Sequence, residues 1–213
     1  METPDEVTTR QSTVEEWTEA LAQSNGSPGG GAGTGVMLGI AASLTSMVAG
    51  YSENADEELL DRARSLRRTA LRLADEDAAA SKAFGAAFRL DPGPSRDEAI
   101  RKASVEAAKA SAVLGDRAIG AIEDLGWLAM NGNPALIADV VVAFGALRAA
   151  IAGARTNVSF DLAALAKGGT SLEEVRSRHP ELWQTVGQLS SALDRIDELT
   201  AQVDAKAAPT DAL

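Results

Sequence analysis

The sequence has no cysteine and a single histidine, His179. Without cysteine no disulfide can form, and no thiolate is available as a nucleophile or metal ligand. One histidine is also too few for most imidazole-based metal cages. No cluster of acidic residues has metal-ligand spacing either, so we expect no metal site and no bound cofactor.

Aromatic residues are scarce, at 4% of the 213 residues, whereas hydrophobic residues make up 45% and alanine is abundant. This balance favours closely packed helices over a sheet, because sheets prefer β-branched and aromatic side chains. No segment of useful length alternates polar and apolar residues with period two. We therefore expect an all-α protein with one core of single-domain size.

Positive charge is in short supply as well, since 20 Lys and Arg stand against 31 Asp and Glu. Nucleic acid and anionic membranes both require a basic patch, so we expect neither as a partner. Residues 29–52 carry no charge and could span a bilayer by length. Small residues dominate this segment and its flanks lack the Lys/Arg bias of a spanning helix. We expect a buried central helix instead, in a cytoplasmic protein whose polar N-terminus is no secretory signal.

Helix starts are marked by a capping side chain followed three residues later by an acid, at Thr13, Asn54, Ser95 and Ser171. Asn133 followed by Pro134 marks a fifth start. Together with glycine- and proline-rich ends, these signals predict six helices, over 13–23, 31–52, 55–90, 95–131, 134–167 and 172–206. We expect an antiparallel bundle that forms one domain over 13–206, between flexible residues 1–12 and 207–213.

The third helix carries an apolar stripe that repeats like heptads: Leu59, Ala63, Leu66, Ala70, Leu73, Ala80, Phe84 and Phe88. Asp77 interrupts this stripe and places a carboxylate on the side that faces the core. A buried carboxylate is costly unless it is paired or hydrogen-bonded. Asp77 is therefore either an acid–base group in a site or one half of a structural ion pair.

Helix lengths bring other polar residues to the level of Asp77. At about 1.5 Å per residue, counting from the connecting turns puts Gly31, Ala108–Ser111 and Asn157 in the same layer. Gly31 ends a glycine-rich loop, and the free N–H groups of the helix that follows favour an anion or a carbonyl oxygen. Asn157 and Asp161 are four residues apart and share a helix face, which suggests a polar cavity.

Two further candidates fit this layer less well. Asp139 is the only charge in its apolar stretch, but it lies eighteen residues before Asn157, about 27 Å along a straight helix. It could reach the site only across a subunit interface, and a structural role explains it equally well. Lys109 lies near the layer but off the apolar stripe, where a solvated position is the simpler interpretation.

Three segments together resemble one known family. Residues 27–52 are similar to a PGGG signature and its helix, 73–84 to an Asp-containing helix with Asp77 at the matching position, and 131–162 to a segment that carries Asn133, Asp139 and Asn157. The likeness runs over residues 13–200 and is to the formiminotransferase-cyclodeaminase / methenyltetrahydrofolate cyclohydrolase family. It implies a helical folate enzyme that associates as a homodimer or larger assembly.

The resemblance implies action on tetrahydrofolate that carries a one-carbon unit. We expect hydrolysis of 5,10-methenyltetrahydrofolate first, as in standalone bacterial members. Release of ammonia from formiminotetrahydrofolate is the alternative, and a non-catalytic folate-binding protein or structural oligomer is a third. Ala-rich helices with few aromatics independently suggest apolar faces that another subunit would cover.

Within this resemblance Asp77 is the expected acid–base group, Asn157 orients water or a ring nitrogen, and Asp139 is the next catalytic candidate. The expected substrate-binding residues are Pro28, Gly29, Gly30, Gly31, Ser111, Asn133, Asp161 and Lys109. Three positions depart from the family pattern: Ala32 replaces a serine, Ala110-Ser111 replaces Val-Pro, and Asp161 replaces an asparagine. Asp161 adds a negative charge and could tune Asp77 by like-charge coupling.

Overall fold

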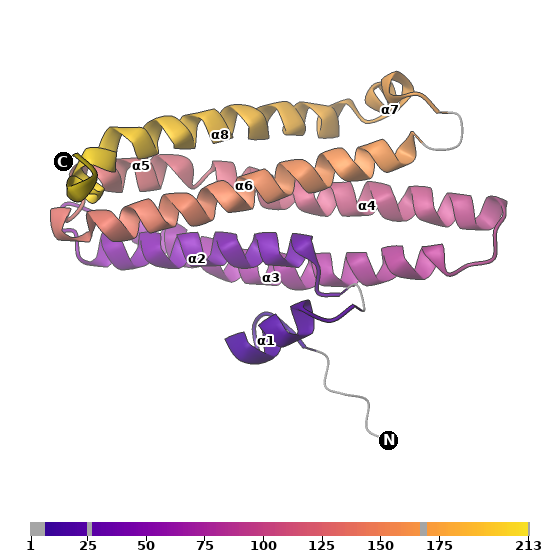
Figure 1. Ribbon diagram of the computed structural model, residues 1–213, viewed down its shortest axis with the longest axis horizontal. Coiled ribbons are helices and arrows are strands. Elements are labelled where there is room, and N and C mark those ends of the chain that lie inside the picture. Colours follow the sequence, from indigo (N-terminus) through magenta and orange to yellow (C-terminus); the bar gives the residue numbers. More distant parts are fainter. Residues whose placement is uncertain (1–6, 25–26, 167–169, 213) are drawn as a thin grey trace.

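The computed structural model describes residues 7–24, 27–166 and 170–212, and those ranges contain helices but no strand (Figure 1). The all-α bundle is therefore confirmed. Its elements are α1 (Val14–Leu21), α2 (Gly30–Gly50), α3 (Glu57–Phe88), α4 (Pro94–Ile119), α5 (Ile122–Asn131), the 3₁₀ turn η1 (Pro134–Leu136), α6 (Ile137–Leu165), α7 (Leu172–Arg178), α8 (Pro180–Ala207) and the 3₁₀ turn η2 (Pro209–Ala212).

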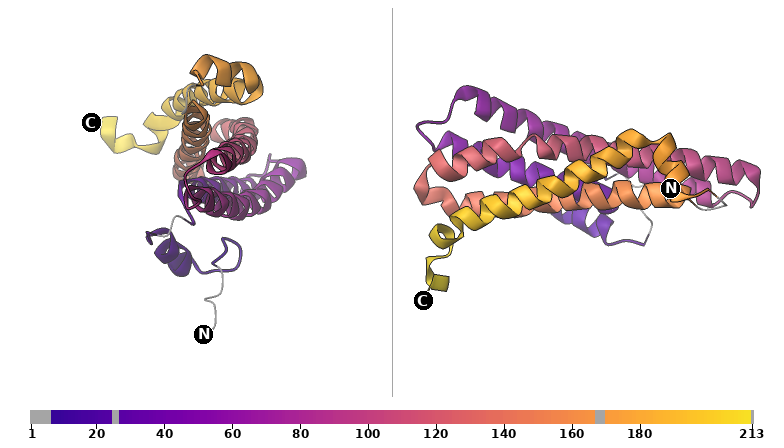
Figure 2. Two further views of the ribbon diagram at one scale, coloured as in Figure 1. Left: turned by 90° about the vertical axis from the view of Figure 1, so that its right-hand side faces the viewer. Right: turned by 90° about the horizontal axis from the view of Figure 1, so that it is seen from above.

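The long helices lie side by side along one axis, and an end-on view shows them in layers (Figure 2). α8 covers α4 and α6, which cover α2 and α3, and α1 lies outermost. α6 packs against α2, α4, α5, α7 and α8, so it is the most central element. α2 is buried where it meets α3 and α6, but its far side exposes Met37, Ile40 and Met47.

Some predicted helix boundaries are confirmed and others are wrong. Thr13 and Ser171 form complete capping boxes, as their spacing indicates. Asn54 does not cap its helix, because Asp56 is the N-cap of α3. The Asp56 carboxylate accepts a hydrogen bond from the backbone N–H of Leu59, the third residue of the helix. Ser95 is also not a cap, because Pro94 already occupies the first position of α4.

Three of the predicted helices are interrupted. The predicted helix 95–131 breaks at Gly120, where glycine favours a turn, and divides into α4 and α5. The predicted helix 172–206 breaks before Pro180, which has no N–H to continue the hydrogen-bond ladder. The predicted helix 134–167 begins with the 3₁₀ turn η1, and the α-helix α6 starts only after it.

The chain ends differ in part from the expected flexible segments. The backbone N–H of Thr9 and the guanidinium of Arg10 both bond to Asp75 on α3, with N–O distances of 2.6 Å and 3.1 Å. The tail contains the turn η2. Residues 1–6 and 213, at the outer ends of the two predicted flexible segments, lie outside the described residues.

A row of glycines lets α2 approach α3 closely. Gly31, Gly35 and Gly39 are spaced by four residues and therefore share one face of α2. A Cβ atom on Gly35 would lie 2.7 Å from the Cβ of Ala74, closer than real Cβ contacts. The close approach brings the first turn of α2 against the middle of α3.

The first turn of α2 lies beside Asp77 of α3. From Asp77, α3 continues for eleven further residues to Phe88. Those residues extend past the start of α2 toward the α3–α4 turn (Figure 1). Phe88 is 43% exposed and Phe84 is half-buried, so the core stripe predicted for α3 does not hold at this end. The uncovered end of α3 forms one wall of a cavity.

Two helical segments are long and apolar enough to cross a membrane by length and composition alone, α2 and residues 134–165. Both pack within the bundle, and core helices of soluble proteins meet the same test. Our expectation of a cytoplasmic protein stays a prediction.

Candidate active site

A cavity of about 390 Å³ opens at the first turn of α2, between α3, α4 and α6. Its size suits a small ligand, since such pockets usually span roughly 300–1,000 Å³. The lining residues are Gly29, Gly30, Gly31, Asp77, Ser81, Lys82, Phe84, Gly85, Arg89, Ala107, Ser111, Asn157, Phe160 and Asp161. The structure thus brings together seven of the eleven site residues expected from the sequence, from four separate helices.

Asp77 lines this cavity and is only 7% exposed. Its carboxylate presses against Gly31 so closely that a Cβ atom there would overlap the carboxyl oxygens. Ser81 donates to Asp77 Oδ2 at 3.4 Å, and the backbone N–H of Ala32 also donates to the carboxylate. The N-cap residue of α2 provides no side-chain hydrogen bond, so the first N–H groups of α2 lack a cap. Asp77 accepts a hydrogen bond from one of them.

Burial raises the pKa of Asp77 above its ordinary value, while the hydrogen bonds from Ser81 and Ala32 oppose this effect. None of the ion pairs among the described residues includes Asp77. The structure therefore does not support a structural ion pair as the reason for this buried carboxylate.

Asp161 faces the same cavity from α6, one turn after Asn157. Burial, followed by the nearby charge of Asp77, raises its pKa to about 7. Within the described ranges Asp161 has neither a hydrogen-bond partner nor an ion-pair partner. Two carboxyl groups therefore share one partly buried space, and neither forms an ion pair with a described side chain.

The outer part of the cavity combines aromatic and cationic side chains. Phe84 and Phe160 lie on opposite walls, on α3 and α6, and Phe160 is 67% exposed. Lys82 and Arg89 contribute positive charge from α3. Sequence reasoning missed these residues because Phe84 belongs to the predicted core stripe and no motif or spacing singles out the others. Ser81 could have been found, since it lies four residues after Asp77 on the same face.

Comparison with known proteins identifies the family. A family model described as formiminotransferase-cyclodeaminase matches residues 13–177. The chain belongs to the formiminotransferase-cyclodeaminase family. No curated protein matches the chain.

A solved structure of similar fold is that of the formiminotetrahydrofolate cyclodeaminase of Thermotoga maritima. It superposes with a TM-score of 0.70 and 21% identity, over 91% of this chain and 98% of the other. At this identity the likeness shows a shared fold, and it extends along nearly the whole of both chains.

Four residues that the family resemblance and the loop suggested lie outside the cavity lining. Asp139 is in the first turn of α6 and Asn133 precedes η1, both at the opposite end of the bundle from the start of α2 (Figure 1). Asn133 caps η1 and also donates to the carbonyl of Tyr51, which is a structural role. Lys109 points to solvent and pairs with Glu106 at 3.0 Å. Pro28 precedes the lining glycines but does not line the cavity itself.

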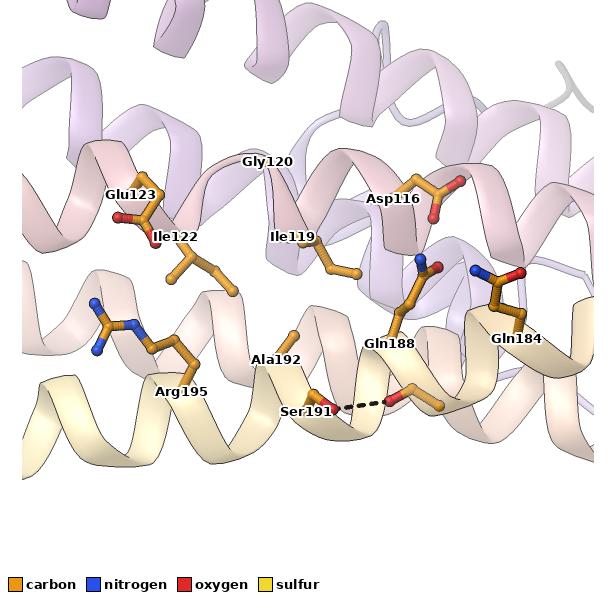
Figure 3. Close-up of a pocket in the computed structure, with 11 residues that line it drawn as sticks. Asp116, Ile119, Gly120, Ile122, Glu123, Gln184, Gln188, Ser191, Ala192 and Arg195 are labelled. Carbon is orange, nitrogen blue, oxygen red and sulfur yellow. Dashed lines mark hydrogen bonds between the residues drawn. The ribbon is translucent and has the colours of Figure 1, made fainter. Parts of the chain in front are cut away.

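A larger surface groove, of about 1010 Å³, lies between α8 and the α4–α5 junction (Figure 3). Figure 3 shows polar side chains along its rims, among them Asp116, Gln188 and Arg195, which are exposed. It holds no buried titratable group among its lining residues. The family resemblance places none of the motif residues there, so the smaller cavity is the better candidate for chemistry.

Among the described residues no group of three or more His, Asp and Glu side chains is arranged to hold a metal ion. Beside the cations Lys82 and Arg89, the cavity offers two carboxyl groups, one amide and two hydroxyl groups. That set is suited to moving protons and to stabilising positive charge.

Proposed function

We propose that this member of the formiminotransferase-cyclodeaminase family is a folate enzyme that hydrolyses 5,10-methenyltetrahydrofolate to 10-formyltetrahydrofolate. The observation that carries the proposal is the pair Asp77 and Asp161, whose carboxyl groups line one cavity and form no ion pair with a side chain in the described part of the chain. Methenyltetrahydrofolate carries a positive charge over the carbon that joins N5 and N10. A cavity with unneutralised carboxylate charge favours such a cation and the charge that persists as water adds.

In this reaction Asp77 acts as the base. Its burial and raised pKa make the carboxylate a better proton acceptor than a solvated aspartate. Asn157, on the facing helix, orients the attacking water or a ring nitrogen through its amide. The free N–H groups of Gly30 and Gly31 at the start of α2 offer donors to a carbonyl oxygen of the substrate.

The rest of the cavity fits the shape and charge of a folate. Phe84 and Phe160 provide flat apolar surfaces on which a pterin ring can stack. Lys82 and Arg89, at the same end of α3, suit the carboxylates of the glutamate tail. The cationic carbon then lies toward Asp77 and the anionic tail toward the cations.

A second reaction is the cyclodeamination of formiminotetrahydrofolate, in which N10 attacks the formimino carbon and ammonia leaves. Departure of ammonia needs a proton donor, and a carboxyl with a pKa of about 7 can supply one at neutral pH. The solved protein of the same fold is named for this activity.

One absorbance assay separates the two reactions, because both involve the methenyltetrahydrofolate chromophore. A cyclohydrolase speeds the loss of this absorbance beyond spontaneous hydrolysis, and a cyclodeaminase generates the absorbance from formiminotetrahydrofolate. We expect the first result. If neither substrate turns over, titration with a reduced folate separates a folate-binding protein from a structural oligomer, and both outcomes contradict the proposed function.

A further inference from the structure

We propose that Asp161 is a second catalytic residue, the proton donor of a carboxyl pair that it forms with Asp77 and that holds one proton between the two groups in the resting enzyme. This inference rests on the proposed function and extends it, because the hydrolysis as proposed assigns proton transfer to Asp77 alone. The resemblance noted in the sequence implies an asparagine at this position, so Asp161 adds a carboxyl group to the cavity.

Few titratable groups line the cavity beside Asp77 and Asp161. Asp77 enters the cavity from α3 and Asp161 from α6, on the opposite wall. Among the lining residues, α2 and α4 contribute no titratable side chain. The remaining charged lining groups are Lys82 and Arg89, both exposed and both later in α3. Two like charges confined in this way cannot both form easily, so one proton stays with the pair.

The surroundings of the two carboxyl groups differ in a way that assigns the proton. Asp77 receives hydrogen bonds from Ser81 and from the Ala32 N–H, and it lies at the positive end of the α2 dipole. Asp161 has no donor of this kind among the described residues. Asp77 therefore ionises first and serves as the base, while Asp161 keeps the proton and serves as the acid. When the surroundings push the pKa values of two carboxyl groups apart in this way, one group acts as the acid and the other as the base.

For release of ammonia, N10 attacks the carbon of the protonated formimino group, and the proton that N10 loses passes to the Asp77 carboxylate. Asp161 then protonates the amino group on the tetrahedral carbon. The carbon–nitrogen bond breaks, ammonia leaves with the bonding electron pair, and the lone pair of N5 restores the cationic methenyl carbon. A proton transfer from Asp77 to Asp161 returns the pair to its resting state.

For hydrolysis, water adds to the methenyl carbon and transfers a proton to Asp77. Asp161 protonates N5 as its bond to the carbon breaks, and the hydroxyl proton passes to the Asp161 carboxylate as the formyl carbonyl forms. Asp77 then releases to solvent the one proton that the overall reaction produces. The same pair thus serves either reaction.

The first test uses the ligand-free protein and requires no turnover. Carbon-13 labelled aspartate side chains are titrated by NMR in the wild type and in Asp161→Asn. We expect one carboxyl group in the wild type to titrate near pH 7. In the variant that transition should vanish, whereas Asp77 should titrate as in the wild type, because Asp161 is still protonated and uncharged when Asp77 ionises. Absence of any aspartate that titrates above about pH 6 would overturn the proposal.

The second test compares pH–rate profiles of the wild type, Asp161→Asn and Asp161→Glu. The wild-type rate should fall as pH rises through about 7, where Asp161 loses its proton. Asp161→Asn should lose roughly 10²-fold or more in turnover and lose this pH dependence, since an amide cannot donate a catalytic proton in this way. Asp161→Glu should recover part of the rate and the pH dependence.

Asparagine is nearly isosteric with aspartate and matches the family pattern, and melting curves confirm that the variant is folded. An Asp161→Asn enzyme with the wild-type rate and profile contradicts a catalytic role. A wild-type protein that turns over neither folate defeats the proposed function instead, while the ligand-free titration still decides whether the carboxyl pair exists.

Discussion

Asp77 occupies a position where an ionised carboxylate is costly for the fold. It is almost fully buried, it has no cationic partner among the described residues, and burial is the main cause of its raised pKa. A residue kept at such a position without an ion pair is a candidate for chemistry. Its bonds to Ser81 and Ala32 fix the carboxylate in one orientation toward the cavity.

The first prediction is that Asp77→Asn does not destabilise the protein. The amide oxygen can still accept from the Ala32 N–H, and no partner charge is left unpaired. The melting temperature at neutral pH should equal or exceed that of the wild type. A structural ion pair would behave differently, because the loss of one partner typically costs about 3–5 kcal/mol. A large drop in melting temperature would therefore show that Asp77 has a cationic partner after all.

The second prediction concerns the pH dependence of stability at Asp161. Folding raises the pKa of this carboxyl from its ordinary value of 3.8 to about 7, so the folded protein holds the proton more tightly than the unfolded chain. The associated stability is fully present below the unfolded pKa and is lost as pH rises through about 7. Asp161→Asn cannot suffer this loss. As pH rises from acid to mildly alkaline, the free energy of unfolding of the variant should increase by about 1–3 kcal/mol relative to that of the wild type.

Urea unfolding at several pH values measures this difference, with Asp197→Asn as a control. Asp197 is an exposed carboxylate whose pKa is lowered by Arg148, so its contribution to stability has the opposite sign. The interpretation fails if Asp161→Asn and the wild type show the same pH dependence.

At the scale of the helices, the site depends on how closely α2 packs against α3. The first turn of α2 reaches Asp77 only because glycine occupies the contact positions Gly31 and Gly35. The same contact gives Asp77 a donor at the start of α2. The glycine row therefore determines both the packing and the position of the carboxylate.

The third prediction compares Gly31→Ala with Gly33→Ala. A Cβ at Gly31 would overlap the Asp77 carboxyl, whereas a Cβ at Gly33 would meet no atom within 4 Å. Gly31→Ala should displace the carboxylate, lower stability by about 1–3 kcal/mol and reduce turnover. Gly33→Ala should raise stability slightly, because alanine favours a helix. Equal behaviour of the two variants in melting and turnover assays would contradict the described contact.

The parts of the fold that the sequence predicts well follow from local chemistry. The Thr13 and Ser171 caps need only residues within one turn, and both are as expected. The common level of Gly31, Asp77 and Asn157 follows from helix lengths, because rise per residue varies little. Periodicity then places Asp77 toward the core.

The remaining features depend on long-range packing. Gly120 is compatible with a helix interior or a break, and only the packing of α4 and α5 decides between them. Phe84 looks like a core residue because its spacing does not reveal that α2 starts too late to cover it. Helix rise already places Asp139 far from Asn157, but the sequence position of Asn133 does not show that it lies at the other end of the bundle from the cavity.

At the scale of the whole molecule, α2 and α6 pack together and both carry exposed apolar side chains. Met37, Ile40 and Met47 are between 37% and 48% exposed on α2, and Val142 is 60% exposed on α6. Soluble monomers rarely leave large apolar surfaces open to water. We therefore propose that this face is covered by a second copy of the chain.

The fourth prediction is that the protein is a homodimer or larger assembly through this face. Light scattering should give at least twice the chain mass of 22.0 kDa at micromolar concentration. Ile40→Glu should shift the protein toward the monomer, because a carboxylate cannot be buried in an apolar interface without cost. Val113→Glu, an exposed apolar residue on α4, is the matched control and should leave the mass unchanged. A wild-type monomer would contradict this proposal.

The central claim is that Asp77 performs proton transfer on a one-carbon folate in the cavity at the start of α2. The most direct measurement is the rate at which methenyltetrahydrofolate absorbance is lost with excess enzyme, corrected for spontaneous hydrolysis, for the wild type and folded Asp77→Asn. We predict a rate well above the spontaneous one for the wild type and a loss of roughly 10²–10⁴-fold in the variant. A folded Asp77→Asn protein that retains the wild-type rate would contradict the claim.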